Sequence, residues 1–182
     1  MDAFEAVVAS VLQRRGYWTI LNWKVALTKE EKRRIGRHSS PRWELDVLAY
    51  RGDTNEILVM ECKSFLDSPG VRCATFAGNH PEDEKGYKLF FDTKLREVVF
   101  SRLTTDLVQQ RFCRKQPTIA LGLAAGKVHG DEAWLRSRCE SQGWQFLGPT
   151  ELKTELSSLK DTSYENSVAS VVSKLLLRGE VK

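Results

Sequence analysis

Two acids and one lysine near the middle of the chain have the types and spacing for metal-assisted hydrolysis. Lys63 follows Glu61 by two positions, and Asp46 precedes both. Hard divalent ions such as Mg2+ take oxygen ligands and are commonly held by one or two carboxylates together with substrate phosphates. A lysine beside them can hold or help deprotonate the attacking water and offset the charge of the transition state. The three residues therefore predict hydrolysis of a phosphodiester with Mg2+, for which Mn2+ would substitute.

Two strands joined in a hairpin must position these residues. Residues 43–50 and 57–65 are rich in apolar and β-branched types, and the segment between them contains Gly, Asp and Asn, which favour a tight turn. A symmetric turn pairs residues whose numbers sum to 107, so Asp46 faces Glu61, and alternation puts Lys63 on the face of Glu61. Opposed carboxylates repel each other and need a cation. The alternative interpretation is a half-exposed strand on which Glu61 and Lys63 form a solvated ion pair.

Periodicity along the rest of the chain predicts an α/β fold. We expect helices at 2–15, 93–113 and 131–142, strands at 17–27, 118–125 and 144–147, and an irregular, substrate-facing segment at 67–84 with a short strand near 71–76. The tail has two helical patterns, the second with aliphatic residues on one side: Val168, Val171, Val172, Leu175 and Leu176. This order predicts a mixed central sheet flanked by helices. We expect one domain at 1–150 and, packed on it, a C-terminal helical extension at 151–182.

The chain resembles a known family at these residues. Leu45-Asp46, a spacer of fourteen residues and Glu61-Cys62-Lys63 resemble the signature of the PD-(D/E)XK nuclease superfamily. The resemblance covers about two thirds of the chain and implies the restriction-endonuclease-like fold, with Asp46 and Glu61 as metal ligands and Lys63 as the residue that handles the water. Leu45 replaces the proline of the motif name, and Cys62 takes the variable position.

The family often adds an acid from its first helix, and Glu5 matches that position. The resemblance implies that Glu5 assists catalysis by binding a second metal ion or its waters. Helical spacing puts Glu5 beside an apolar stripe, where an unpaired charge is costly, so a polar partner on the sheet would explain it. The alternative is a glutamate in the first helical turn that is favoured by the helix dipole.

A basic segment precedes the Asp46 strand. Residues 29–42 contain six basic residues and two acids, interrupted by Gly, Ser and Pro, and we interpret this segment as a mobile loop. Its cations would contact the phosphates of DNA entering the site. The DNA-binding candidates are Lys32, Arg33, Arg34, Arg37 and Arg42. The alternative is a charged loop that aids solubility.

Composition narrows the class of protein. The 182 residues are 41% hydrophobic and carry a net charge of +4, which is typical of a globular protein. No apolar run approaches the roughly 20 residues of a membrane span. The N-terminus carries Asp2 and Glu5 where a secretory signal would carry Lys or Arg, so we expect a cytoplasmic protein without membrane association. The four cysteines form no C-x-x-C pair, and buried free thiols are expected.

Three functions are compatible with these patterns. The first is a metal-dependent DNA endonuclease, for which a homodimer would be one simple way to cut both strands. The second is a catalytically inactive module of the same fold that binds DNA or takes part in an assembly. The third is a small protein-interaction domain that uses its C-terminal helices.

Overall fold

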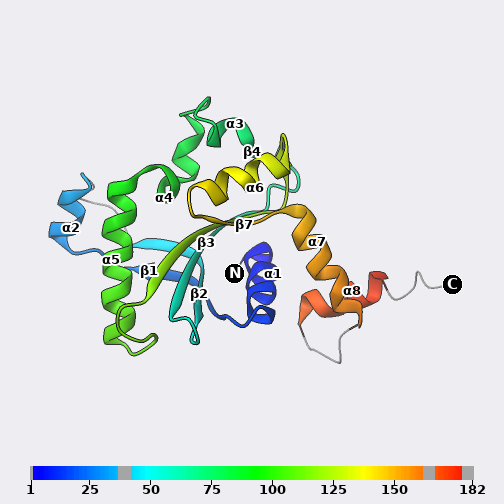
Figure 1. Ribbon diagram of the computed structural model, residues 1–182, viewed down its shortest axis with the longest axis horizontal. Helices are drawn as coiled ribbons and strands as arrows, with labels where there is room; N and C mark the ends of the chain where they lie inside the picture. Colours follow the sequence, from blue (N-terminus) through cyan, green and yellow to red (C-terminus); the bar gives the residue numbers. More distant parts are fainter. Residues whose placement is uncertain (1, 37–41, 162–166, 178–182) are drawn as a thin grey trace.

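A mixed five-stranded sheet forms the centre of the protein. The computed structural model describes residues 2–36, 42–161 and 167–177 (Figure 1). The strand order is β1-β2-β3-β5-β7, in which β1, β2 and β3 are antiparallel neighbours and β3, β5 and β7 run parallel. The strands are β1 Trp18–Val25, β2 Trp43–Arg51, β3 Glu56–Lys63, β5 Thr118–Ala125 and β7 Gln145–Leu147. A second, two-stranded sheet pairs β4 Val71–Arg72 with β6 Val128–His129.

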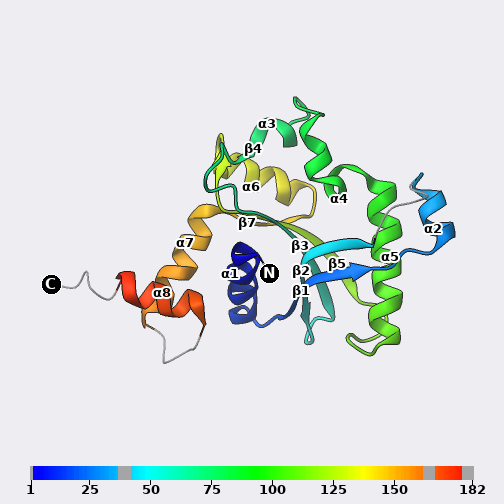
Figure 2. The ribbon, with the colours of Figure 1, turned by 180° about the vertical axis from the view of Figure 1, so that it is seen from behind.

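Helices cover both faces of the sheet. Helices α1 and α7 lie on one side, and α5 and α6 lie on the other, with α3 and α4 next to α6 (Figures 1 and 2). The helices are α1 Ala3–Arg14, α2 Lys29–Arg34, α3 Cys73–Phe76, α4 Lys88–Phe91, α5 Thr93–Gln109, α6 Glu132–Ser141, α7 Pro149–Ser158 and α8 Val168–Leu177, with single 3-10 turns at Asp83–Gly86 and Leu159–Asp161. The predicted α/β class, with a mixed sheet flanked by helices, is confirmed.

The first helix forms where its sequence pattern places it. The Asp2 carboxylate caps the helix by accepting the backbone N–H of Phe4 at 2.7 Å. Val8, Val11 and Leu12 recur at helical spacing and are buried against the sheet. This face of α1 joins one core with β2, β3 and α7, while a larger core fills the space between the other face of the sheet and α5.

The central hairpin has the predicted register. The pairs run from Val47 with Met60 to Arg51 with Glu56, and the numbers in each pair sum to 107. The apolar side chains sort by alternation, because Leu58 and Met60 face α1 and Val59 faces α5. The hairpin is therefore fixed by its turn and by two cores that accept opposite faces of the same strand.

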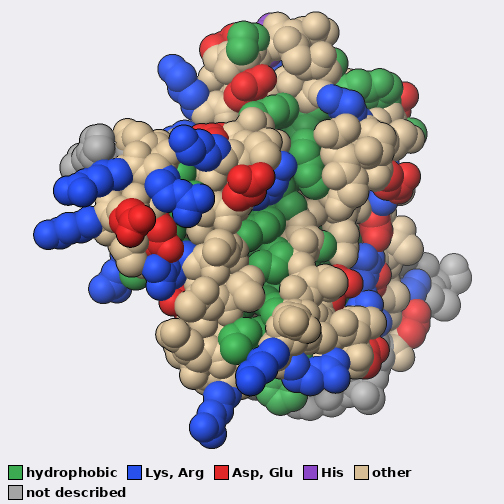
Figure 3. Space-filling model, turned by 60° about the vertical axis from the view of Figure 1, so that its left-hand side comes forward, with side chains coloured by type: hydrophobic (Ala, Val, Ile, Leu, Met, Phe, Trp, Pro, Cys, Tyr) green, Lys and Arg blue, Asp and Glu red, His purple; other side chains and the backbone are tan. Residues whose placement is uncertain are grey.

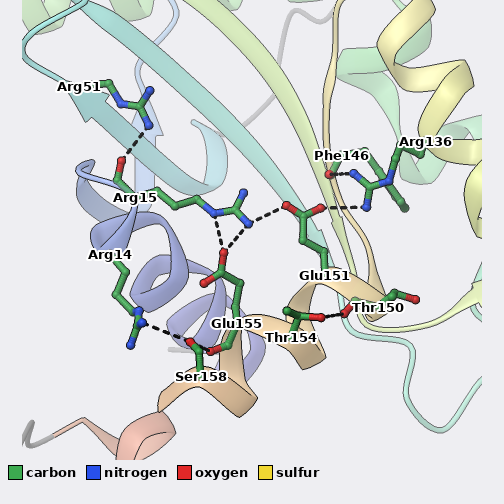
Figure 4. Close-up of polar contacts among 10 residues, drawn as sticks. All are labelled: Arg14, Arg15, Arg51, Arg136, Phe146, Thr150, Glu151, Thr154, Glu155 and Ser158. Atoms are coloured by element: carbon green, nitrogen blue, oxygen red, sulfur yellow. Dashed lines mark hydrogen bonds and ion pairs between the residues drawn. The ribbon is translucent and has the colours of Figure 1, made fainter. Parts of the chain in front are cut away.

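The start of the C-terminal segment is fastened to α1. The Arg15 guanidinium pairs with Glu151 at 2.6 Å and with Glu155 at 2.7 Å, and Arg136 holds the other oxygen of Glu151 at 2.8 Å (Figure 4). Leu152 is buried in the core shared with α1. Helix α7 begins at Pro149, so the predicted boundary at 150 falls inside a helix.

The last described helix, α8, turns its aliphatic side outward. Val168, Leu175 and Leu176 are exposed, whereas Ser170 and Ser173 are buried against the protein. The pattern predicted the helix and its apolar side, but it did not show which side would face the domain.

Two local predictions are wrong. The basic segment does not begin as a loop, because Lys29–Arg34 is a helix with a capping box between Thr28 and Glu31. The Glu31 carboxylate also accepts three hydrogen bonds from the Arg102 guanidinium of α5, which fastens the short helix to the domain. In the irregular segment, the predicted strand near 71–76 ends at Arg72, and Cys73–Phe76 forms a helical turn, α3.

No helix within residues 2–36, 42–161 and 167–177 combines the length and the apolar character that a membrane span requires.

Candidate active site

The ladder between β1 and β2 is interrupted at Asp46. Pairs on both sides of the gap sum to 68, so Asn22 lies opposite Asp46, yet these two residues do not pair. Residues two apart on a strand normally face the same side. Here Leu45 packs in the core under α5, while Val47 packs in the core under α1. The strand therefore turns over at Asp46, and Asn22 takes up the change with a positive φ of 53°.

The carboxylate of Asp46 reaches β3. Its Oδ2 accepts the backbone N–H of Cys62 at 2.7 Å. The ladder between β2 and β3 ends one pair earlier, at Val47 and Met60. Asp46 and Glu61 are thus not a backbone pair as predicted, because the Asp46 side chain replaces the backbone as the partner of β3 at this point.

Glu61 and Lys63 form an ion pair beside Asp46. Lys63 Nζ lies 2.6 Å from Glu61 Oε1, and both side chains are largely buried. The ammonium also lies 5.8 Å from the centre of the Tyr87 ring. Cys62 packs on the opposite face with Met60, and burial raises the pKa of its thiol, so it stays neutral. Glu61 and Lys63 therefore share one face of β3 and Cys62 lies on the other, as alternation along the strand predicts.

Glu5 joins the site from α1. Its Oε2 accepts a hydrogen bond from Asn22 Nδ2 at 3.0 Å. Asn22 is therefore the polar partner on the sheet that would explain a glutamate beside the apolar stripe of the helix. The strained residue in the β1 strand thus holds an acid of α1 next to Asp46. Strained backbone of this kind concentrates at functional sites.

The three acids share one electrostatic environment. Burial is the main cause that raises the pKa of Glu5, of Asp46 and of Glu61. Repulsion from Asp46 raises the pKa of Glu5 further, and repulsion from both Asp46 and Glu5 raises that of Glu61. Lys63 opposes the shift at Asp46 and at Glu61. One lysine therefore faces three carboxylates that desolvation and mutual repulsion disfavour as anions.

This donor set fits a hard divalent cation. Carboxylates whose pKa values are raised by burial and by neighbouring acids gain from a cation bound between them, and Mg2+ needs only one or two of them. The three acids do not form a closed set of ligand atoms within 4.8 Å; among the described residues, only His80, Glu82 and Asp83 do, on the surface. Asp46 and Glu61 would hold the ion, with Glu5 next to them.

The predicted DNA-binding residues that the structure describes lie in α2 and directly before β2. Helix α2 forms the lobe at the left of Figure 3, where lysine and arginine side chains gather beside a strip of hydrophobic ones. Lys32, Arg33, Arg34 and Arg42 form no ion pair within the described part of the chain. Arg37 lies outside the described residues. Of the predicted DNA-binding cations, Lys32, Arg33 and Arg34 stand on α2, whereas Arg42 directly precedes β2, the strand that carries Asp46.

A cavity of about 320 Å3 opens beside Lys63. Its walls come from the loop after β3, from α3 and from the segment that leads into α4, and they include Phe65, Thr75, Asp83 and Tyr87. A larger cavity of about 400 Å3 lies between β1 and α5, but no acid, lysine or arginine is among its lining residues. The smaller cavity is therefore the one that adjoins the chemistry.

Sequence reasoning missed Asn22 and Tyr87. Asn22 left a signal, because it is the one polar residue between the apolar and aromatic residues of the run ILNW. Tyr87 left no signal, because the residues around it in the sequence do not show that its ring will lie near Lys63 of β3.

Comparisons with known proteins yield one match to a solved structure. No protein-family model and no curated protein matches the chain. A crystal structure titled "Crystal Structure of Protein of Unknown Function AF1548" is similar at 14% sequence identity with a TM-score of 0.45, over 95% of this chain and 77% of that one.

Proposed function

We propose that the protein is a metal-dependent nuclease that hydrolyses DNA phosphodiester bonds, with a core of the restriction-endonuclease-like type. The observation that carries the proposal is the meeting of Asp46, Glu61 and Lys63 just past the last pair of the β2–β3 ladder, where the Asp46 carboxylate bonds to the β3 backbone and the Lys63 ammonium contacts Glu61. Burial of the acids also argues against the alternative of a solvated ion pair on an exposed strand.

Each residue has a role that follows from its contacts. Asp46 is oriented by the Cys62 N–H, so one carboxylate oxygen is fixed and the other is available to a ligand. Mg2+ bound to Asp46 and Glu61 would polarise the phosphate and acidify a water molecule. Lys63 would then exchange its contact with Glu61 for the attacking water or a phosphate oxygen, because its flexible stem starts on the same face. Glu5, held by Asn22, would orient a water molecule at the α1 side.

Electrostatics also suits an anionic polymer. The cations of α2 stand on a helix that Glu31 and Arg102 anchor, so they can contact phosphates without ordering a loop first. Contacts of this kind add affinity that falls steeply with salt and does not depend on sequence. DNA is the substrate that we propose, with Mg2+ as the resident ion and Mn2+ as its substitute.

A cleavage assay tests the proposal. Wild type, Asp46→Ala and Lys63→Ala are incubated with single-stranded, duplex and branched DNA in Mg2+ or Mn2+, with Asp53→Ala as a control because Asp53 is an exposed acid in the β2–β3 turn. We expect cleavage by wild type and the control and a loss of at least 100-fold in the other two variants. Equal cleavage in all four proteins would refute the assignment.

The 2.6 Å contact between Lys63 and Glu61 favours a second candidate. A glutamate that is permanently neutralised by its lysine would not recruit an ion, and the protein would then be a DNA-binding or assembly module without activity. That protein would bind DNA with a steep dependence on salt and would show no divalent ion at Asp46 in a crystal soaked in Mn2+.

A further inference from the structure

The cavity beside Lys63 has a rigid outer wall. The backbone N–H of Gly126 donates to the Lys63 carbonyl at 2.9 Å, and that of Val71 donates to the Lys127 carbonyl at 2.9 Å. These bonds pin both ends of the loop 64–70 to the turn after β5. Gly126 permits the close approach, since a Cβ there would lie 2.4 Å from the Ser64 carbonyl oxygen. The loop is therefore a fixed wall and not a mobile flap.

Phe65 stands on this wall in a strained conformation. Its φ is +44°, which is unusual for a bulky residue, and its side chain lines the cavity while the residue stays 36% exposed. At this position, two residues after β3, Gly or Asn would adopt the positive φ more readily than Phe. An exposed aromatic ring held at this strain, next to the proposed catalytic lysine, offers a flat surface on which another ring can stack.

Tyr87 supplies an unused polar group at the other side of the cavity. The residue is only 5% exposed, yet its hydroxyl stays accessible and forms no hydrogen bond with the described residues. Asp83 lies close enough to Tyr87 to raise the pKa of the phenol, after burial as the main cause. The cavity thus offers a hydroxyl donor and a carboxylate acceptor.

The charges favour a base over a phosphate. The two cations that line the cavity are already paired, Lys63 with Glu61 at 2.6 Å and Arg72 with Asp83 at 3.5 Å. A phosphate inside the cavity would have to displace a carboxylate from each of these cations, and it would meet the Asp83 carboxylate there. A nucleobase has an aromatic face and donors and acceptors on its edge, which match the ring, the hydroxyl and the carboxylate.

We propose that this cavity receives the base of an unpaired nucleotide next to the scissile phosphate, so that the protein prefers DNA with an unpaired base at that position. The inference rests on the proposed nuclease function. A volume of about 320 Å3 is at the lower end of small-molecule sites and suits one base. Phe65 stacks on the base, and Tyr87 and Asp83 contact its edge. The substrate class is therefore single-stranded DNA or duplex with an extruded nucleotide.

Binding to oligonucleotides that carry one abasic position tests the proposal. Affinity is measured by fluorescence anisotropy in EDTA, which separates binding from cleavage, while the abasic position is moved along a single strand. We expect one position at which loss of the base weakens binding by wild type about tenfold. A duplex with one unpaired nucleotide should bind about tenfold more tightly than a fully paired duplex.

Three variants locate the effect. Phe65→Gly removes the ring and suits the positive φ, so it keeps the fold, and Tyr87→Phe removes only the hydroxyl. In Phe65→Gly, the abasic position should no longer weaken binding at all. In Tyr87→Phe, the weakening caused by the abasic position should be several-fold smaller than in wild type. Phe112→Ala, which removes an aromatic residue that is 50% exposed in the cavity between β1 and α5, should keep it.

The outcomes separate this inference from the nuclease proposal. A wild type that cleaves DNA yet shows no sensitive abasic position overturns the base cavity and leaves the nuclease. Sensitivity that persists unchanged in Phe65→Gly and Tyr87→Phe also overturns it. Sensitivity that these variants abolish in a protein without cleavage supports the cavity and refutes the nuclease. A wild type that binds no DNA at low salt refutes both.

Discussion

We expect Asp46→Asn to be more stable than wild type without metal and less stable than wild type once a divalent ion is added. Without metal, burial and neighbouring acids raise the pKa of Asp46 and of Glu61, so the folded state binds protons more tightly than the unfolded state. At pH 7.5 the ionised acids therefore destabilise the fold. Asn removes one charge and keeps an oxygen for the Cys62 N–H, so Asp46→Asn should unfold at a higher temperature than wild type in EDTA.

The effect of metal has a calculable size. An ion present at 100 times its dissociation constant stabilises the folded state by about 2.7 kcal/mol. For a chain of 182 residues, 1 kcal/mol corresponds to about 2–4 °C in the unfolding midpoint. Saturating Mn2+ should therefore raise the midpoint of wild type by about 5–10 °C. Asp46→Asn, with half of the carboxylate pair gone, should gain less than about 2 °C.

Differential scanning calorimetry in EDTA and across a Mn2+ titration measures both effects. The matched control is Asp53→Asn, which removes an equal charge from an exposed turn and should follow wild type throughout. If Asp46→Asn gains as much from Mn2+ as wild type does, the ion does not bind at Asp46. If Asp46→Asn is less stable than wild type in EDTA, the carboxylate is stabilised by its contacts and the electrostatic reasoning is wrong.

Further predictions concern pH and the elements around the site. In EDTA, the unfolding midpoint of wild type should fall as the pH rises from about 4 toward neutrality, because the folded state, in which the pKa values of Asp46 and Glu61 are raised, holds protons on these acids more tightly than the unfolded state does. Asp46→Asn, which lacks one of these acids, should show a shallower fall of the midpoint with pH. Asn22→Gly keeps the positive φ but releases Glu5, so the free energy of urea unfolding should change by less than about 1 kcal/mol while DNA cleavage falls at least tenfold; unchanged cleavage would remove Glu5 from the site. Arg15→Gln, which cuts the ion pairs from α1 to α7, should lower the free energy of urea unfolding by about 1 kcal/mol and leave cleavage per folded molecule unchanged; a loss of cleavage would mean that α7 helps to shape the site.

The sequence alone determined the parts of the fold that depend on local pattern. The period-2 runs on both sides of a Gly-Asp-Asn turn fixed the hairpin, because a shift by one residue would move every apolar side chain to the wrong face. The spacing of Val8, Val11 and Leu12 likewise fixed the buried side of α1. The capping box at Thr28 and Glu31 was also present in the sequence, and the helix that it starts ends at Arg34, ahead of the Gly, Ser and Pro that suggested a loop.

Tertiary structure decided how the acids meet. The local sequence does not show that the β1–β2 ladder breaks at Asn22 and Asp46. The break occurs because Leu45 packs in the core under α5 while Val47, two residues later, packs in the core under α1. The contact of Asn22 with Glu5 joins a helix to a strand, and the cavity between Phe65 and Tyr87 joins segments that only the packed fold brings together. Such contacts depend on the relative placement of elements, and side-chain patterns along a single element carry no information about it.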